Sequence, residues 1–157
     1  MGHDGSTVLA SYSYDGLSQI VVEDFEVPDV RLDYYDDASG APVPGTYENL
    51  DRYGRVTAQL WRDYTASADR EKFEYNYDVA SSRTWKDHTA QGAPTTQDEV
   101  YTYDERSRLT KMERGTLSSG SITSPKREEN YTLDDVGSWS TYLTKKDVGG
   151  NLATETD

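Results

Sequence analysis

The sequence contains no cysteine, and its 157 residues include only two histidines, His3 and His88. Without cysteine the chain has no disulfides, no zinc-thiolate sites and no thiol nucleophile. No Gly-x-Ser-x-Gly elbow accompanies the histidines, and no glycine-rich phosphate loop is present. The 29 acidic residues could in principle supply a carboxylate pair for glycoside hydrolysis, but no pair stands out. The sequence therefore predicts no catalytic residue, no cofactor and no enzymatic activity.

Basic residues are also few: 16 lysines and arginines against 29 acids give a net charge of −13. This charge argues against nucleic acid as a partner, because binding nucleic acid requires neutralisation of phosphates. No stretch approaches the roughly 18 apolar residues of a membrane span, so no membrane insertion is expected. The first five residues, MGHDG, have neither the basic start nor the apolar run of a signal peptide. An exported protein with this start is expected to be a processed piece or a fragment of a longer chain.

Hydrophobic residues make up only 34% of the chain, which is too few for a thick core. Disorder is not expected either, because the chain has 13 tyrosines, 3 tryptophans and 2 phenylalanines, and disordered chains contain few aromatic residues. A tyrosine buries a large ring while its hydroxyl still reaches a polar partner. This composition favours a thin sheet with one solvent-exposed face over a helical bundle.

Five segments of the chain share a pattern in which an aromatic residue or leucine stands directly before an aspartate. The segments are YSYDGLSQI (12–20), YENLDRYGRVT (47–57), FEYNYDVASSR (73–83), YTYDERSRLT (101–110) and YTLDDVGSW (131–139). Their aspartates are Asp15, Asp51, Asp78, Asp104 and Asp134, separated by 36, 27, 26 and 30 residues. Regular spacing with variable filler is typical of repeated hairpins that have loops of uneven length.

Each segment has the period of a β-strand before its aspartate and a turn after it. Aromatic residues alternate with polar ones, so the rings share one face of a strand. An aspartate opens a turn well because its carboxylate accepts backbone N–H groups two residues on. Three residues after the aspartate stands Gly54, Gly137 or a serine (18, 81 and 107), which suits a position with positive φ. The fold expected over residues 1–157 is one all-β domain of repeated antiparallel β-hairpins.

Other segments are expected to be loops. Glycine and proline place loops at residues 38–45, 91–96 and 118–125. Residues 65–72 are expected to connect strands rather than to form a helix. The polar segment 149–157 is expected to fray.

The repeated pattern resembles the signature of Rhs/YD-repeat proteins, Tyr-x-Tyr-Asp-x-x-Gly-Arg-Leu. The copy YTYDERSRLT matches it best, with Ser107 in the glycine place, and YENLDRYGRVT keeps Gly54-Arg55-Val56. The other three copies are more degenerate. The resemblance covers nearly the whole chain, and residues 47–139 are especially similar to the repeats of very large surface proteins of planctomycete-like bacteria.

The resemblance implies a structural role at the cell surface or outside the cell. YD repeats form hairpins that join into a long curved strip of sheet, and in large members the strip becomes a shell around a toxin domain or presents an adhesive surface. The expected partners are neighbouring repeats or copies of the same chain, joined through sheet edges. The repeat positions then have structural roles: Tyr14, Asp15, Asp51, Gly54, Tyr77, Asp78, Tyr103, Asp104, Asp134 and Gly137.

Three alternatives remain open at this point. Trp61, Trp85 and Trp139 could stack on sugar rings, which would make the chain a carbohydrate-binding module with glycans as partners. Free sheet edges could join copies head to tail into a fibre. The acidic stretches 33–37 and 134–135 could bind calcium, but the spacing of a calcium loop is absent, so an ordinary solvated surface is favoured and no metal site is predicted.

Overall fold

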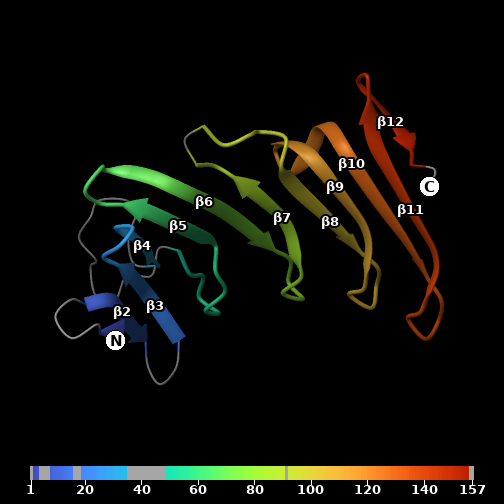
Figure 1. Cartoon of the computed structure of the whole chain (residues 1–157). Coiled ribbons are helices and arrows are strands. Elements are labelled where there is room, and N and C mark those ends of the chain that lie inside the picture. The colour runs from blue at the N-terminus through green and yellow to red at the C-terminus, as the bar shows by residue number, and fades with distance from the viewer. Residues whose placement is uncertain (1, 4–7, 16–18, 35–48, 91, 156–157) are drawn as a thin grey trace. The chain divides into compact units, whose positions relative to one another are not determined.

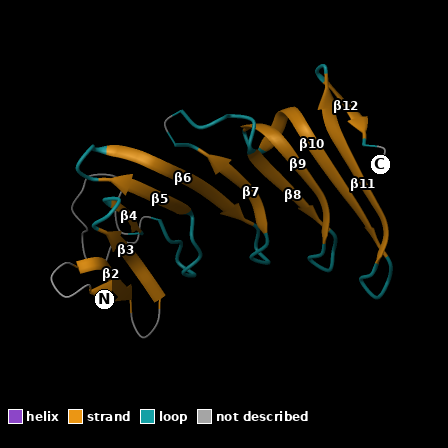
Figure 2. Ribbon diagram, viewed as in Figure 1, coloured by secondary structure: helices purple, strands orange, loops and turns teal. Residues whose placement is uncertain are grey.

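The computed structural model describes residues 2–3, 8–15, 19–34, 49–90 and 92–155, and these residues form strands and turns without any helix (Figures 1 and 2). No helix that could cross a membrane occurs in this described part. The all-β prediction is confirmed. The strands are β1 (Gly2–His3), β2 (Val8–Asp15), β3 (Gln19–Phe25), β4 (Val30–Asp33), β5 (Ala58–Asp63), β6 (Ala68–Tyr77), β7 (Arg83–His88), β8 (Asp98–Tyr103), β9 (Leu109–Ser118), β10 (Ser121–Leu133), β11 (Trp139–Val148) and β12 (Asn151–Thr154).

The strands are hydrogen-bonded in chain order, from β1 to β12, and the described pairs are antiparallel. Among the residues that the structure describes, consecutive strands are therefore joined by hairpins or local loops, as a series of repeated hairpins requires. The chain divides into two compact units, residues 1–74 with 89–93 and residues 75–88 with 94–157. A single domain over residues 1–157 stays a prediction, and each unit is described separately below.

The first unit has a small apolar core on β3, β4 and β5. Val21 is completely buried, and Leu32 and Leu60 are nearly so. Aromatic rings extend this core, because Phe25 stacks on Trp61 at a centroid distance of 6.2 Å and meets Tyr12 edge-on at 6.4 Å. Ring pairs at such distances add stabilisation beyond the buried area alone.

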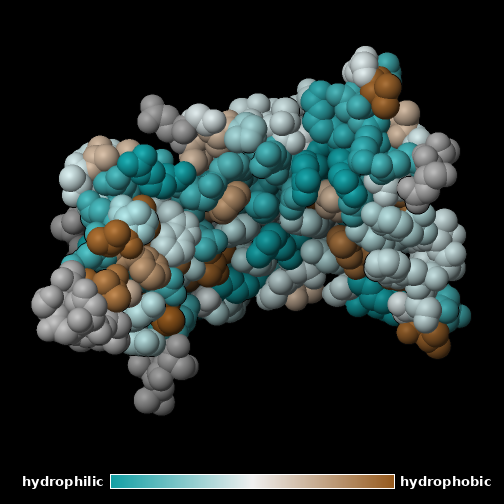
Figure 3. Space-filling view, viewed as in Figure 1, coloured by the Kyte–Doolittle hydropathy of each residue, from teal (hydrophilic) through white to brown (hydrophobic). Residues whose placement is uncertain are grey.

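The second unit has long strands and little apolar burial. Among the described residues of this unit, Met112 on β9 is the buried apolar side chain. Most residues of β8 to β10 are only half-buried. On the face shown in Figure 3, apolar side chains form small separate patches among hydrophilic ones. A thin sheet with a wet surface, as the composition predicts, must therefore be stabilised largely by backbone ladders and polar side-chain contacts.

The loop expected at residues 118–125 is wrong. Ser119 and Gly120 alone make the turn, with φ of 50° and 79°, and β10 begins at Ser121. Two central residues with positive φ are the usual solution for a tight hairpin, since their twist matches that of the strands. Pro125 stands within β10 at a register shift opposite Gly115. A bulge tolerates proline because the missing N–H is not needed for the ladder there, so the proline did not mark a loop.

The other predictions for the connecting segments are correct only in part. The turn after β5 ends at Ser67, so the loop predicted for residues 65–72 is wrong from Ala68 onward, where β6 begins and pairs with β5. Residues 92–97 form a loop between β7 and β8, while Gln91 and residues 38–45 lie outside the described residues. The segment expected to fray from Gly149 instead forms a turn and β12, whose residues 151–154 pair with β11.

Candidate functional site: the aspartate turns

Four of the five repeat aspartates close the same backbone turn, and the turn after the fifth, Asp15, lies outside the described residues. In each, the N–H of the aspartate donates to the carbonyl of the residue four places later, at 2.9–3.0 Å. The N–H three places later donates back to the carbonyl of the aspartate, at 2.9–3.1 Å. The aspartates and their fourth residues are Asp51 with Arg55, Asp78 with Ser82, Asp104 with Arg108 and Asp134 with Ser138.

The aspartate carboxylate provides a second set of bonds inside the turn. One oxygen, Oδ1, accepts the backbone N–H four residues later in all four turns, at 2.8–3.0 Å. In the turns of Asp51, Asp104 and Asp134 the same oxygen also accepts the N–H two residues later. These N–H groups point into the turn and cannot join a strand ladder, so the carboxylate satisfies donors that would otherwise be left to water.

The third residue after each aspartate has a left-handed backbone. The φ values are +75° at Gly54, +67° at Ser81, +58° at Ser107 and +90° at Gly137. Only glycine enters this region without a steric penalty, and a positive φ is uncommon for other residues. The small residues in the repeat pattern therefore stand where the turn reverses the chain.

Two of the turns add an ion pair to this geometry. The side chains of Arg55 and Arg108 donate from Nε to Asp51 and Asp104, at 2.5 and 2.7 Å. The backbone N–H of Arg108, with its guanidinium and the N–H of Arg106, lowers the pKa of Asp104 below its usual value. Partial burial opposes the same shift at Asp51, but the donors of Arg55 and the N–H of Tyr53 still lower the pKa of Asp51. Both carboxylates are therefore fixed as anions at neutral pH.

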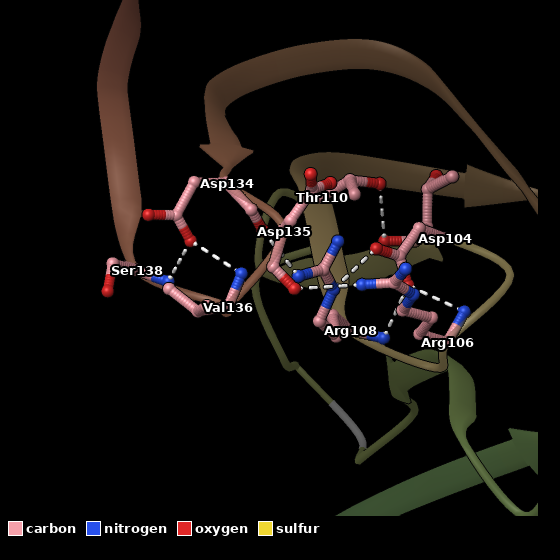
Figure 4. A network of polar contacts seen from close by, with 9 residues as sticks. Asp104, Arg106, Arg108, Thr110, Asp134, Asp135, Val136 and Ser138 are labelled. Atoms are coloured by element: carbon pink, nitrogen blue, oxygen red, sulfur yellow. Dashed lines mark hydrogen bonds and ion pairs between the residues drawn. The ribbon is translucent and has the colours of Figure 1, made fainter.

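The arginines of one turn also contact the next turn, as Figure 4 shows. Arg108 donates from Nη1 to the carbonyl of Asp134 at 2.8 Å, and Arg106 donates to the carbonyl of Asp135 at 2.9 Å. On the other side, the hydroxyl of Tyr103 donates to the carbonyl of Arg83 in the preceding repeat at 2.9 Å. The repeat centred on Asp104 is thus bonded to the repeat before it and to the repeat after it.

A second polar feature, missed in the sequence, repeats five residues before the aspartate. Glu99 accepts the hydroxyl of Tyr101, and Glu129 accepts the hydroxyl of Tyr131. Arg114 donates to Glu99 from Nε at 3.0 Å, and Arg127 donates to Glu129 from Nε at 2.6 Å. The signal that could have revealed the feature is the sequence Glu-x-Tyr in both repeats, Glu99-Val-Tyr101 and Glu129-Asn-Tyr131.

These contacts keep the glutamates charged despite their burial. Burial alone raises the pKa of Glu99, but the hydroxyl of Tyr101, Arg114 and Lys86 together hold this pKa below its usual value. The same balance lowers the pKa of Glu129. Burial and the adjacent carboxylate raise the pKa of the Tyr101 hydroxyl, so the tyrosine remains a donor.

Glu128 forms a separate charged centre across three strands. It accepts from Lys145 on β11 at 2.6 Å and from Asn130 at 2.9 Å, and it pairs with Lys111 on β9 at 3.1 Å. These donors, Lys145 first, lower the pKa of Glu128 to about 2. A carboxylate held ionised in this way is a poor general acid at neutral pH, but it is well suited to tie strands together.

The structure places the other predicted positions at strand ends. Tyr77 and Tyr103 end β6 and β8, directly before their aspartates, and Tyr14 is exposed on β2. Asp15 ends β2 and pairs with Gln19, but the turn between them, residues 16–18, lies outside the described residues. These positions come together within each repeat, and hydrogen bonds join the turns of Asp104 and Asp134.

The tryptophans and acidic clusters show no shared site. Trp61 packs on Phe25, Trp85 is half-buried in β7, and Trp139 packs against Tyr131 and Tyr142 at centroid distances of 5.5 and 5.9 Å. Of the stretch 33–37, Asp33 is buried and paired with Arg31 at 2.6 Å, while residues 35–37 lie outside the described residues. Among the described residues no three acidic or histidine side chains gather as a metal site would require.

No protein-family model matches the chain. No curated protein matches it either. Solved structures do match. The Tc holotoxin pore of Photorhabdus luminescens is 19% identical with a TM-score of 0.65, over 96% of this chain and 7% of that one. The TcdB2–TccC3 complex is 18% identical with a TM-score of 0.65, over 98% of this chain and 8% of that one. The TcdB2–TccC3–Cdc42 complex is 18% identical with a TM-score of 0.64, also over 98% and 8%. The chain thus has an Rhs-like β-repeat fold and spans less than a tenth of these chains.

Proposed function

We propose that this chain is a structural, non-catalytic segment of a YD-repeat array in a larger secreted or cell-surface protein of the Rhs type. In that protein it forms part of a wall that encloses or displays another domain. The observation that carries this proposal is the turn closed in the same way by Asp51, Asp78, Asp104 and Asp134. A turn that recurs with the same two backbone hydrogen bonds while its flanking residues change serves the backbone and not a ligand.

The links between repeats support a wall rather than a set of independent hairpins. An isolated two-stranded hairpin is marginally stable in water and needs further strands. Arg106 and Arg108 connect one turn to the next, and Glu128 ties β9, β10 and β11 together. Through such contacts each repeat is stabilised by its neighbours, as in other repeat proteins.

Two measurements test the array role without any ligand. In a Trp85→Phe background, Trp61→Phe leaves Trp139 as the one tryptophan, in the second compact unit, and Trp139→Phe leaves Trp61, in the first. Thermal unfolding followed by fluorescence and by far-ultraviolet circular dichroism should give coincident transitions in both variants. Separate transitions would show that the two compact units unfold independently. Turnover of a glycoside, ester or peptide that is lost on substitution of one carboxylate would contradict the non-catalytic role.

A carbohydrate-binding surface is the second candidate, and one feature favours it. Trp139 and Tyr142 are exposed and stacked at an interplanar angle of 21°. Beside them is an open pocket of about 320 Å³ lined by Arg108, Leu109, Tyr131, Leu133, Gly137 and Trp139. Flat exposed rings beside polar donors suit a sugar. A glycan array with Trp139→Ala tests this candidate, and Tyr53→Ala, which removes another exposed aromatic ring, is the control.

A further inference from the structure

Two junctions between neighbouring repeats have the same strand pairing. Between β7 and β8 the pair nearest the aspartate turns is Trp85 with Val100, and between β9 and β10 it is Lys111 with Asn130. In both junctions the paired residues stand seven places after one repeat aspartate and four places before the next. Positions of the β7–β8 junction therefore correspond one by one to positions of the β9–β10 junction.

The residue directly before the second aspartate differs between these junctions. In the β7–β8 junction it is Tyr103, which is half-buried and whose hydroxyl donates to the carbonyl of Arg83 at 2.9 Å. In the β9–β10 junction it is Leu133, which is shorter than a tyrosine and has no hydroxyl. Leu109 stands five places after its repeat aspartate, as Arg83 does in the preceding repeat. The β9–β10 junction thus lacks the phenol ring that bridges the β7–β8 junction.

The open pocket of about 320 Å³ lies beside this leucine. Leu133 lines it together with Arg108, Leu109, Tyr131, Gly137 and Trp139. Arg106 and Arg108 join the two turns at the end of the junction through their bonds to the following repeat (Figure 4). The pocket belongs to the interior of the series, because β9 and β10 are paired with each other and also with β8 and β11.

We propose that this pocket binds a phenol ring, the side chain of a tyrosine presented by a partner polypeptide. The β7–β8 junction shows how such a ring is held, because Tyr103 occupies the corresponding position there and its hydroxyl bonds to a backbone carbonyl. The bound ring packs against Leu109 and Leu133 and donates its hydroxyl to the carbonyl of Leu109. The partner is the domain that the wall encloses or displays, and this part of the inference rests on the proposed array role.

The size and the lining of the pocket favour one aromatic ring over a sugar inside it. Ligand pockets commonly enclose about 300–1,000 Å³, so this pocket is near the lower limit and has room for a ring but not for a chain of sugars. Leu109, Leu133 and the ring of Tyr131 offer apolar and aromatic contact, which suits a phenol better than a hydroxylated sugar. A sugar stacked on the exposed faces of Trp139 and Tyr142 would lie beside the pocket, and the ligand series below separates the two.

Two-dimensional NMR of the whole chain, titrated with p-cresol, tests the site. Saturable shifts are expected at the amides of Leu109, Leu133 and Gly137 and at the indole N–H of Trp139. Leu133→Tyr supplies the missing ring from the chain itself, so these ligand-dependent shifts should be lost. Leu133→Met, which keeps a similar volume without a phenol, is the matched control and should retain them. A parent chain without saturable shifts, or a folded Leu133→Tyr chain that binds like the parent, would overturn the proposal.

The reciprocal substitution tests the correspondence of the two junctions. Tyr103→Leu removes the ring from the β7–β8 junction and should open an equivalent site there, with a second set of saturable shifts at the amides of Arg83 and Thr84. Circular dichroism establishes that each variant is folded, and this second variant keeps the test decisive if Leu133→Tyr does not fold. A folded Tyr103→Leu chain without a second site would show that the residue before the aspartate does not define the pocket, and the proposal would fail.

A series of ligands identifies the source of the ring. N-acetyl-tyrosinamide should shift the same residues as p-cresol, and N-acetyl-leucinamide should not. Binding of p-cresol without binding of N-acetyl-tyrosinamide would overturn the polypeptide as the source and leave a site for free phenols. Shifts with methyl glucoside but not with p-cresol would make the pocket a sugar site and overturn the proposal.

Failure of this inference and failure of the array role give different results. If both compact units unfold together and p-cresol does not bind, the array role stands and the phenol site is wrong. If p-cresol and N-acetyl-tyrosinamide bind but the two units unfold separately, the site stands, whereas the array role and the enclosed or displayed domain as partner fail.

Discussion

Arg108 donates from Nη1 to the backbone carbonyl of Asp134, 2.8 Å away in the turn of the following repeat. The same side chain donates from Nε to Asp104 in its own turn at 2.7 Å. One guanidinium thus holds two turns through donors fixed in a rigid plane, a geometry that a lysine cannot reproduce. The carbonyl of Asp134 also accepts the N–H of Gly137, so the arginine reaches the bond that closes the second turn.

We expect Arg108→Ala to loosen the turn of Asp134 as well as its own. Hydrogen exchange should become faster at the amide of Gly137, and Arg108→Lys should rescue the effect only in part. The amide of Gly54, which closes an equivalent turn in the other compact unit, is the internal control and should keep its rate. Unchanged exchange at Gly137 in Arg108→Ala would mean that the two turns are closed independently.

The carboxylate of Asp134 should matter for its oxygen more than for its charge. Its Oδ1 accepts the N–H groups of Val136 and Ser138 at 3.0 and 2.8 Å. Asp134→Ala removes both bonds and is expected to lower the free energy of unfolding by about 1–2 kcal/mol. Asp134→Asn retains an acceptor oxygen and should lose less than half as much. Equal losses in chemical denaturation of the two variants would show that charge, not turn closure, is the main contribution.

Much of the repeat fold could be predicted because its information is local. The alternation of Tyr101 and Tyr103 and the aspartate after them predict a strand and a turn within a few residues of sequence. The contact of Glu99 with Arg114 could not be predicted in the same way, because it depends on the pairing of β8 with β9. That register is set by a turn and by a bulge between Thr102 and Tyr103, and neither follows from alternation alone.

The wrong loop at residues 118–125 has a related cause. Proline and glycine predict a loop in this segment, but Pro125 lies at a bulge and Gly120 in a two-residue turn. The local signal could not separate these cases, because the bulge is defined by Gly115 on the opposite strand. The hydrogen bonds donated by Arg106 and Arg108 likewise could not be predicted, since their acceptors are backbone carbonyls 29 and 26 residues away in the sequence.

Stability should fall with acid partly through Glu128. Its pKa is lowered from 4.5 to about 2 by Lys145, Asn130 and Lys111, so the folded state favours the ionised form. The stabilisation is complete above the unfolded pKa of 4.5 and is lost as the pH falls from there toward 2. In thermal melts between pH 7 and pH 3, Glu128→Gln should start from a lower melting temperature and show a smaller decrease than the parent.

Glu105→Gln is the matched control for this titration, because Glu105 is exposed in a turn. Its melting temperature should follow that of the parent at every pH. If Glu128→Gln and the parent lose the same amount between pH 5 and pH 3, the interactions of Glu128 with the two lysines do not contribute to acid sensitivity.

Gly115 is the position in β9 that tolerates no side chain. A Cβ atom there would lie 2.2 Å from the carbonyl oxygen of Ser124 and 2.9 Å from the Cα atom of Pro125, both in the backbone of β10. Backbone atoms cannot move aside as the end of a flexible side chain can, so the bulge would have to open. We expect Gly115→Ala to lower the free energy of unfolding by about 1–3 kcal/mol, the range for overpacked sites. Thr116→Ala, the next residue of the same strand, is the control and should change stability far less. Chemical denaturation measures the free energy of unfolding of both variants. In Gly115→Ala, hydrogen exchange should show that the loss of amide protection is concentrated in β9 and β10. A Gly115→Ala variant as stable as the parent would show that the close approach at Pro125 does not fix the register of this hairpin.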